Sequence, residues 1–218
     1  MGLVGAAIRS PDLRGARRSS PRSHMTNPHP IGDPTTDRAA ELRAAMVDAL
    51  ADQLTDPAWR EAFAAVPRHL LVRAFYRMRD YRRVDSDESQ DLDAWLEAVY
   101  SDQTLITQIQ PHAVTSSGTM PGLIAAMLHA LGVDHGDTVL QLGTGTGYTA
   151  ALLCHRLGSG NVVTVDVDPE LTDSAERRLR TVGYGPNVVT ADGAAGYAPR
   201  APYDRLLATF GNRHVPAA

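Results

Sequence analysis

Apolar residues in the first part of the chain recur at the spacing of an α-helix. Between residues 37 and 54 they fall near a period of 3.6 residues, and Thr36 or Asp37 can cap the start, so we expect an amphipathic helix there. A second helix is expected over Pro57–Ala65. It should end before Val66-Pro67, because the residue before a proline avoids the helical region.

A polar segment and a hydroxyl-rich segment follow. Residues 73–90 alternate arginines with acids, and we interpret them as a solvated loop with local charge pairing. A third helix is expected over Pro121–Leu131, ended by Gly132. The residues that could cap it carry hydroxyl groups: Thr115, Ser116, Ser117 and Thr119.

From residue 136 onwards, short apolar runs alternate with helical stretches. Strands are expected at 138–142, 161–167, 187–190 and 204–210, and helices at 148–157 and 169–181. The run at 204–210 is mostly apolar, as in strands buried on both faces of a parallel sheet. Strands and helices that alternate at this spacing predict βαβ units and an α/β fold with a doubly wound sheet.

Composition narrows the class of protein. No run approaches the roughly 20 apolar residues of a membrane span, so we expect a soluble protein without a membrane partner. Cys154 is the single cysteine and lies in an apolar stretch, which favours a buried thiol and a reducing, cytoplasmic compartment. The histidines show no metal-ligand spacing, so no metal site is expected.

Charge and composition divide the chain into three regions. Residues 1–30 are expected to form a disordered N-terminal arm, with Met25 as an alternative start. The first 24 residues carry +4 and the remainder −8, so a nucleic-acid-binding face on the folded part is not expected. Residues 36–135 are expected to form a helical, substrate-side region, and residues 136–218 are expected to form the α/β core.

The strongest candidate site is a glycine-rich turn after the first strand of the core. In the segment Val139–Tyr148, Gly143, Gly145 and Gly147 permit a tight turn and let a ligand approach the backbone. The spacing is neither G-x-G-x-x-G nor a phosphate loop, which disfavours dinucleotides and nucleotide phosphates. A ligand whose amino-acid end and ribose lie over the turn fits better, and S-adenosylmethionine has that shape.

Two acidic strand ends strengthen this interpretation. Asp166 ends the next strand, where its carboxylate can accept from both ribose hydroxyls, whereas Asp168 is better explained as the cap of the helix that begins at Pro169. Asp192-Gly193 follows the third strand and is either a simple turn or an acceptor for the adenine amino group.

Several motifs occur in the order found in one family. They are Val66-Pro-Arg-His-Leu70, the glycine turn, Asp166 with Pro169-Glu-Leu171, Asp192-Gly193 and Ala201-Pro-Tyr-Asp204. Residues 66–216 therefore resemble the protein-L-isoaspartate O-methyltransferase family. The resemblance implies a Rossmann-like methyltransferase fold and an S-adenosylmethionine-dependent carboxyl O-methyltransferase that acts on isoaspartyl or aspartyl residues of proteins or peptides.

The resemblance also assigns residues. It implies that Gly143, Gly145, Gly147, Asp166, Asp192 and Gly193 bind the cofactor. Gln141 occupies a cofactor-binding position where the family usually has an acid. Thr119-Met-Pro121 stands in place of a Ser-Gln-Pro segment near the substrate carboxylate, so Thr119 is the catalytic candidate. For Arg68 and His69, packing or surface pairing explains their presence as well as substrate contact does.

Alternative functions remain open. Tyr100-Ser-Asp102 and the Gly-Thr-Gly-Thr-Gly-Tyr turn are similar to actinobacterial enzymes that methylate aspartate in ribosomally made peptides. A nicotinamide-dependent oxidoreductase is disfavoured by the glycine spacing. The chain ends eight residues after its last strand, so we expect a C-terminal truncation, with the last strands missing, an exposed apolar edge at 206–210 and the alternative of an inactive remnant.

Overall fold

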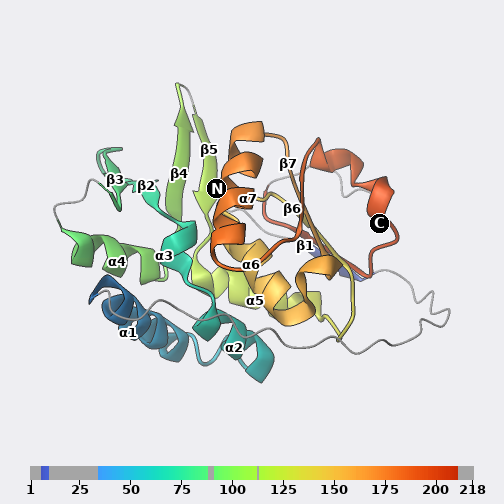
Figure 1. Cartoon of the computed structure of the whole chain (residues 1–218), viewed down its shortest axis with the longest axis horizontal. Helices are drawn as coiled ribbons and strands as arrows, with labels where there is room; N and C mark the ends of the chain where they lie inside the picture. The colour runs from blue at the N-terminus through green and yellow to red at the C-terminus, as the bar shows by residue number, and fades with distance from the viewer. Residues whose placement is uncertain (1–5, 10–33, 88–90, 112, 211–218) are drawn as a thin grey trace.

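The computed structural model describes residues 6–9, 34–87, 91–111 and 113–210. Most of the expected N-terminal arm and the last eight residues of the expected core lie outside these ranges. Figure 1 shows two parts: α1 to α4 with the strands β2 to β5, and a second part that holds β6, β7 and the helices α5 to α7. The candidate site depends on how these two parts meet.

The main sheet has the strand order β1-β9-β6-β7-β8. Its strands are β1 (Ala6–Arg9), β6 (Val139–Leu142), β7 (Val162–Asp166), β8 (Asn187–Thr190) and β9 (Arg205–Ala208). β6 pairs in parallel with both β7 and β9, and β7 pairs in parallel with β8. The four strands expected from the apolar runs are therefore present, and the expected parallel α/β sheet is confirmed.

Helices cover one face of this sheet. They are α5 (Pro121–Leu131), α6 (Tyr148–Leu157) and α7 (Pro169–Thr181), and α6 and α7 begin and end where the sequence predicts. Their apolar side chains form one core with Val139, Val162 and Leu207 of the strands. The opposite face of the sheet packs Leu140, Val165 and Leu206 against Tyr203, next to the short helices η2 (Gly193–Ala195) and η3 (Ala198–Arg200).

Four helices extend the core at its N-terminal side. α1 (Pro34–Ala49) and α2 (Pro57–Ala65) correspond to the two amphipathic helices that the sequence predicts, whereas α3 (Arg68–Leu71) and α4 (Leu92–Tyr100) were not expected. Asp56 caps α2 by accepting from the Ala58 N–H at 2.8 Å. Trp59, Phe63, Trp95 and Leu96 are buried and join the core that α5 and α6 form, so burial of apolar surface holds the helices to the sheet.

A second sheet corrects the expected loop at residues 73–90. It has the order β3-β2-β4-β5, all antiparallel, with β2 (Ala74–Tyr76), β3 (Arg83–Asp85), β4 (Leu105–Gln110) and β5 (Ala113–Gly118). The polar segment is a β-hairpin whose ion pairs, including Arg77 to Asp80, lie on its exposed surface. β4 and β5 stand beside α7 (Figure 1), where the Gln108 amide donates to Asp168 at 2.8 Å.

β1 corrects two further expectations. Residues 6–9, expected to be part of a disordered arm, form a strand that pairs antiparallel with β9, from Ala6 opposite Ala208 to Arg9 opposite Arg205. The edge of β9 is therefore covered, and Leu206 and Leu207 are buried instead of forming an exposed apolar edge. Unpaired backbone at an apolar strand edge is unfavourable, and a segment from elsewhere in the chain satisfies it here.

Candidate functional site

The candidate site lies where the strand order reverses. From β6 the chain proceeds to β7 and β8 on one side and then returns to β9 on the other side. In open α/β sheets the carboxyl ends of the strands at such a point leave a crevice that binds ligands. The glycine-rich turn between β6 and α6 is at this point, and so is the acid that ends β7.

Left-handed backbone explains the glycines of the turn. Gly143 has a φ of 93°, and a Cβ there would lie 2.6 Å from Oγ1 of Thr209. Gly145 has a φ of 51°, and its N–H donates to Oδ2 of Asp166 at 3.0 Å. Residues with a side chain rarely adopt a positive φ, so glycine is required for the turn to lie against Asp166.

The three acids named from the sequence have different surroundings. Asp166 accepts from Gly145 and, at 3.3 Å, from the Asp168 N–H. Asp168 caps α7 by accepting from the Glu170 N–H at 2.8 Å, as expected, and the hydrogen bond from Gln108 holds the pKa of its carboxyl below the usual value. Asp192 accepts from the Ala194 N–H at 2.9 Å, which is the turn interaction that the sequence allowed.

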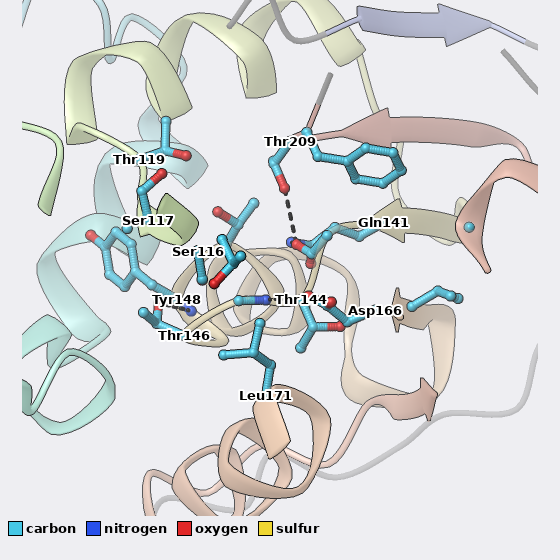
Figure 2. A pocket seen from close by; sticks show the side chains of 18 of the residues that line it. Ser116, Ser117, Thr119, Gln141, Thr144, Thr146, Tyr148, Asp166, Leu171 and Thr209 are labelled. Carbon is cyan, nitrogen blue, oxygen red and sulfur yellow. Dashed lines mark hydrogen bonds between the residues drawn. The ribbon is translucent and has the colours of Figure 1, made fainter. Parts of the chain in front are cut away.

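A cavity of about 510 Å³ joins the glycine turn to β5 and the start of α5. Figure 2 shows Thr119, Ser117 and Tyr148 on one side and Gln141 and Asp166 on the other, with Ser116 between them. Of the sequence-predicted residues, those that line the cavity are Thr119, Gln141, Gly143, Gly145, Asp166, Asp192 and Gly193.

Gly147 does not line the cavity. It has a φ of 87° and caps the start of α6, and a Cβ there would lie 3.2 Å from the side chain of Leu179 on α7. The third glycine of the motif therefore allows close packing between α6 and α7.

Gln141 is a buried amide with an unused acceptor. Its side chain is on β6, is 1% exposed and donates from Nε2 to the carbonyl oxygen of Gly143 at 2.8 Å. Its Oε1 has no hydrogen-bond partner among the described residues. Because a buried acceptor without a partner is costly, this oxygen fits a ligand that brings a donor into the cavity.

The start of α5 is not capped by the hydroxyl groups, which corrects the expectation. Its N-cap residue is Met120, which makes no side-chain cap bond, and the carboxylate of Asp102 accepts from the Gly122 N–H at 2.7 Å. Ser116 and Ser117 belong to β5 instead, and a Cβ on Gly145 would lie 3.7 Å from Oγ of Ser116. The hydroxyl-rich strand thus faces the glycine turn across the cavity.

Two residues on the cavity wall were not among the predicted site residues. Arg68, the first residue of α3, is fully buried, and its guanidinium carbon lies 5.1 Å from the centre of the Tyr148 ring. Burial lowers the pKa of Arg68 and raises the pKa of Tyr148. The motif Val66-Pro-Arg-His-Leu70 includes Arg68, but its residues alone favour cavity contact no more than packing.

The part of the chain that the structure describes contains neither a metal-ligand cluster nor a membrane-spanning helix. Within residues 6–9, 34–87, 91–111 and 113–210, no group of three or more His, Cys, Asp or Glu side chains is arranged to hold a metal ion. None of the helices in those same ranges combines the length and apolar character needed to cross a membrane.

Comparisons with known proteins identify similar chains. The family described as protein-L-isoaspartate(D-aspartate) O-methyltransferase matches residues 40–218. A protein-L-isoaspartate O-methyltransferase from Ignicoccus hospitalis is 41% identical over 100 residues, which are 45% of this chain and 47% of that protein. A solved protein-L-isoaspartate O-methyltransferase superposes with a TM-score of 0.63 and 27% identity, and the match covers 80% of this chain and 50% of the other.

A more distant structure shares the fold. It is described as a putative protein-L-isoaspartate O-methyltransferase from Plasmodium falciparum in complex with S-adenosyl-L-homocysteine. The TM-score is 0.50 at 11% identity, and the match covers 74% of this chain and 66% of that one. The chain spans about half the length of the Ignicoccus relative and of the more similar solved structure.

Proposed function

The chain belongs to the protein-L-isoaspartate(D-aspartate) O-methyltransferase family, and on this premise we propose that it transfers a methyl group from S-adenosylmethionine to a side-chain or main-chain carboxylate of an isoaspartyl or aspartyl residue. The observation that carries the proposal is the single cavity that connects the glycine turn and Asp166 with Thr119 at the start of α5. One side of it offers a cofactor site and the other offers donors for a carboxylate.

The residues present fit S-adenosylmethionine. The cavity volume of about 510 Å³ is within the range of small-molecule sites, and Gly143 and Gly145 leave backbone accessible at the turn. Asp166 would accept from the ribose hydroxyls, and Asp192 would accept from the adenine amino group. The unpaired Oε1 of Gln141 would accept from the cofactor's ammonium group.

The chemistry needs positioning more than acid–base catalysis. When bound, S-adenosylmethionine supplies an electrophilic methyl group on a sulfonium. A carboxylate is already anionic at pH 7, so its oxygen can form the bond to the methyl carbon as the carbon–sulfur bond breaks, without a general base. The cavity walls would hold the carboxylate in line and exclude water, which is worth effective molarities of order 10⁵ M or more.

The start of α5 would orient the substrate carboxylate. The N-terminus of this 11-residue helix is the positive end of the helix dipole, which favours an anion, and the Gly122 N–H there is already bound by the Asp102 carboxylate. Thr119 lies two residues before the helix begins, and we assign its hydroxyl to the substrate carboxylate as a further donor. Ser116 and Ser117, which also line the cavity, are in reach of the same region.

The remaining assignments follow the same proposal. We assign residues 36–135 to the substrate side and residues 136–218 to cofactor binding, because the second sheet and α5 face the glycine turn across the cavity. We infer a protein or peptide substrate and a cytoplasmic location, with no nucleic-acid or membrane partner. The charge of −8 outside the first 24 residues supports the exclusion of nucleic acid.

Calorimetric titration with S-adenosylhomocysteine tests the cofactor assignment. We expect micromolar affinity for the purified chain. A folded chain that does not bind S-adenosylhomocysteine would show that the proposed function is wrong.

A transfer assay then tests the substrate. Two peptides of the same sequence, one with isoaspartate and one with aspartate at a single position, are incubated with labelled S-adenosylmethionine, and the base-labile methyl ester is counted. We expect the isoaspartyl peptide to be methylated. Methylation of the aspartyl peptide alone would point to aspartate modification in a dedicated peptide instead.

A further inference from the structure

Arg68 is a buried cation whose polar atoms are largely unused. Its side chain is 0% exposed, and its one hydrogen bond within the described residues runs from Nη2 to the carbonyl oxygen of Thr119 at 3.3 Å. Nε and Nη1 have no partner there. Asp102 is the acid whose charge acts on it, and Oδ1 of Asp102 already accepts from the Gly122 N–H.

The other buried arginine in the described part of the chain has partners for its charge and its N–H groups. Arg205 is 5% exposed and donates to the carbonyl oxygens of Leu131, Gly132 and Asp204. It also forms an ion pair with Asp137 at 3.3 Å. Because burying a charge without partners costs folding free energy, a chain retains an arginine such as Arg68 only where something offsets the cost.

The contacts of Arg68 place its charge beside the substrate side of the cavity. It lines the cavity together with Gly118, Thr119 and Ile124. Thr119, to which it donates, and Tyr148, whose ring it contacts, lie on the side away from Asp166 (Figure 2). The positive charge is therefore located where the proposed function requires an anion, and away from the ribose-binding acid.

We propose that Arg68 supplies the fixed positive charge that makes the cavity select an ionised carboxylate over a neutral group at the methyl-accepting position. This inference rests on the proposed function and adds its specificity residue. In a desolvated wall, an unpaired guanidinium attracts a carboxylate strongly and gives a carboxamide no comparable gain. The bound substrate would in turn neutralise the charge that folding leaves uncompensated.

A purely structural Arg68 would behave differently. Its contact with the Tyr148 ring and its bond to Thr119 could simply tie α3 to the start of α5. Substitution would then lower stability and weaken every ligand to the same extent. A specificity role predicts instead a loss that depends on the charge of the peptide.

The test is a cycle of two enzymes and two peptides. Wild-type chain and Arg68→Met are each saturated with S-adenosylhomocysteine. Each is then titrated calorimetrically with an isoaspartyl peptide and, separately, with the same peptide carrying isoasparagine. We expect the wild type to prefer the carboxylate by about tenfold or more, and Arg68→Met to bind both peptides within about twofold of each other. Arg68→Lys, which keeps the charge on a side chain of similar length, should retain part of the preference.

Two further readouts separate specificity from folding. S-adenosylhomocysteine affinity should stay within about twofold in the Arg68 variants, and Arg68→Met should melt at or above the wild-type temperature, because an apolar side chain replaces an uncompensated buried charge. The matched control Arg205→Met should melt lower, because the carbonyl oxygens of Leu131 and Gly132 lose their donor and Asp137 loses its ion pair, and it should keep the wild-type peptide preference.

The outcomes distinguish the inference from the function on which it rests. An Arg68→Met chain that keeps the wild-type carboxylate preference overturns the role of Arg68 alone. A wild-type chain that binds S-adenosylhomocysteine but neither peptide overturns the proposed substrate and, with it, the specificity role. A folded wild-type chain that binds no S-adenosylhomocysteine overturns the proposed function itself.

Discussion

The carboxylate of Asp102 accepts a hydrogen bond of 2.7 Å from the backbone N–H of Gly122, so a residue that follows α4 caps the first turn of α5. The contact is tight: a Cβ on Gly122 would lie 2.7 Å from Oδ2 of Asp102. Because Thr119 lines the cavity two residues before α5 begins, this pair fixes the position of Thr119 as well.

Removing that cap should destabilise the chain measurably. We expect Asp102→Ala to lower the free energy of unfolding by about 1 to 2 kcal/mol, the usual scale for the loss of an N-cap acceptor. Urea denaturation followed by circular dichroism gives the value. Asp93→Ala is the control, because Asp93 forms an exposed ion pair with Arg38 and its loss should cost below about 0.5 kcal/mol. Equal losses in both variants would contradict the capping role.

Substitution of the two acids at the end of β7 should have different effects, one on cofactor binding and the other on stability. Asp166→Ala is expected to weaken S-adenosylhomocysteine binding by about 2 to 3 kcal/mol, because a charge-assisted pair of hydrogen bonds is lost. Asp168→Ala should leave that affinity unchanged and lower stability by about 1 kcal/mol, because Asp168 caps α7. Calorimetry and thermal melting of both variants provide the comparison. An unchanged affinity in Asp166→Ala would move the ribose contact elsewhere.

Gln141 should matter for binding and not for folding. Gln141→Met keeps the side-chain length, removes the buried oxygen that has no partner and gives up one hydrogen bond to Gly143, so the free energy of unfolding should change by less than about 1 kcal/mol. Affinity for S-adenosylhomocysteine should fall by about 1 to 2 kcal/mol, since the ammonium group loses an acceptor. A variant that binds S-adenosylhomocysteine as tightly as wild type would show that the amide serves the turn alone.

Thr119 is expected to affect turnover alone. Thr119→Val keeps the shape and removes the hydroxyl, so kcat/KM for the isoaspartyl peptide should fall by about tenfold, while S-adenosylhomocysteine affinity stays within about twofold. Thr181→Val, at the exposed end of α7, is the matched control and should leave both quantities unchanged. Wild-type turnover in Thr119→Val would remove the hydroxyl from the proposed mechanism.

The half of the fold with strong local signals could be predicted from the sequence. α7 begins at Pro169 after its Asp168 cap, and α6 begins after the glycine turn, because proline, capping acids and glycine act over a few residues. The cavity lining around Gly143 and Asp166 followed from the order of these elements, since parallel strands bring their carboxyl ends to one edge.

The elements that were not predicted from the sequence form through contacts with residues far away in the chain. β2 and β3 are only three residues long each, too short for an alternating pattern to stand out, and β5 carries hydroxyls that resemble caps. β1 pairs with β9 across almost 200 residues, and no local signal announces such a contact. The exceptional feature of Arg68 is that its buried Nε and Nη1 have no hydrogen-bond partner among the described residues, which only the packed structure can show.

The single cysteine provides a probe of how tightly the core is closed. Cys154 is 3% exposed on α6, and burial raises the pKa of its thiol to about 12. At pH 8 the native thiolate fraction is therefore about one in ten thousand, against roughly a quarter in an unfolded chain with an ordinary thiol. Iodoacetamide should label the native chain at least about a thousandfold more slowly than the chain in urea. In the native state the Cys154 thiol stays protonated as pH rises from the ordinary thiol pKa towards 12, whereas in the unfolded state it ionises. The free energy of unfolding therefore falls as pH rises across that window. Fast native labelling, with Cys154→Ala as the unlabelled control, would show that α6 opens locally and that the core beneath the glycine turn is not closed.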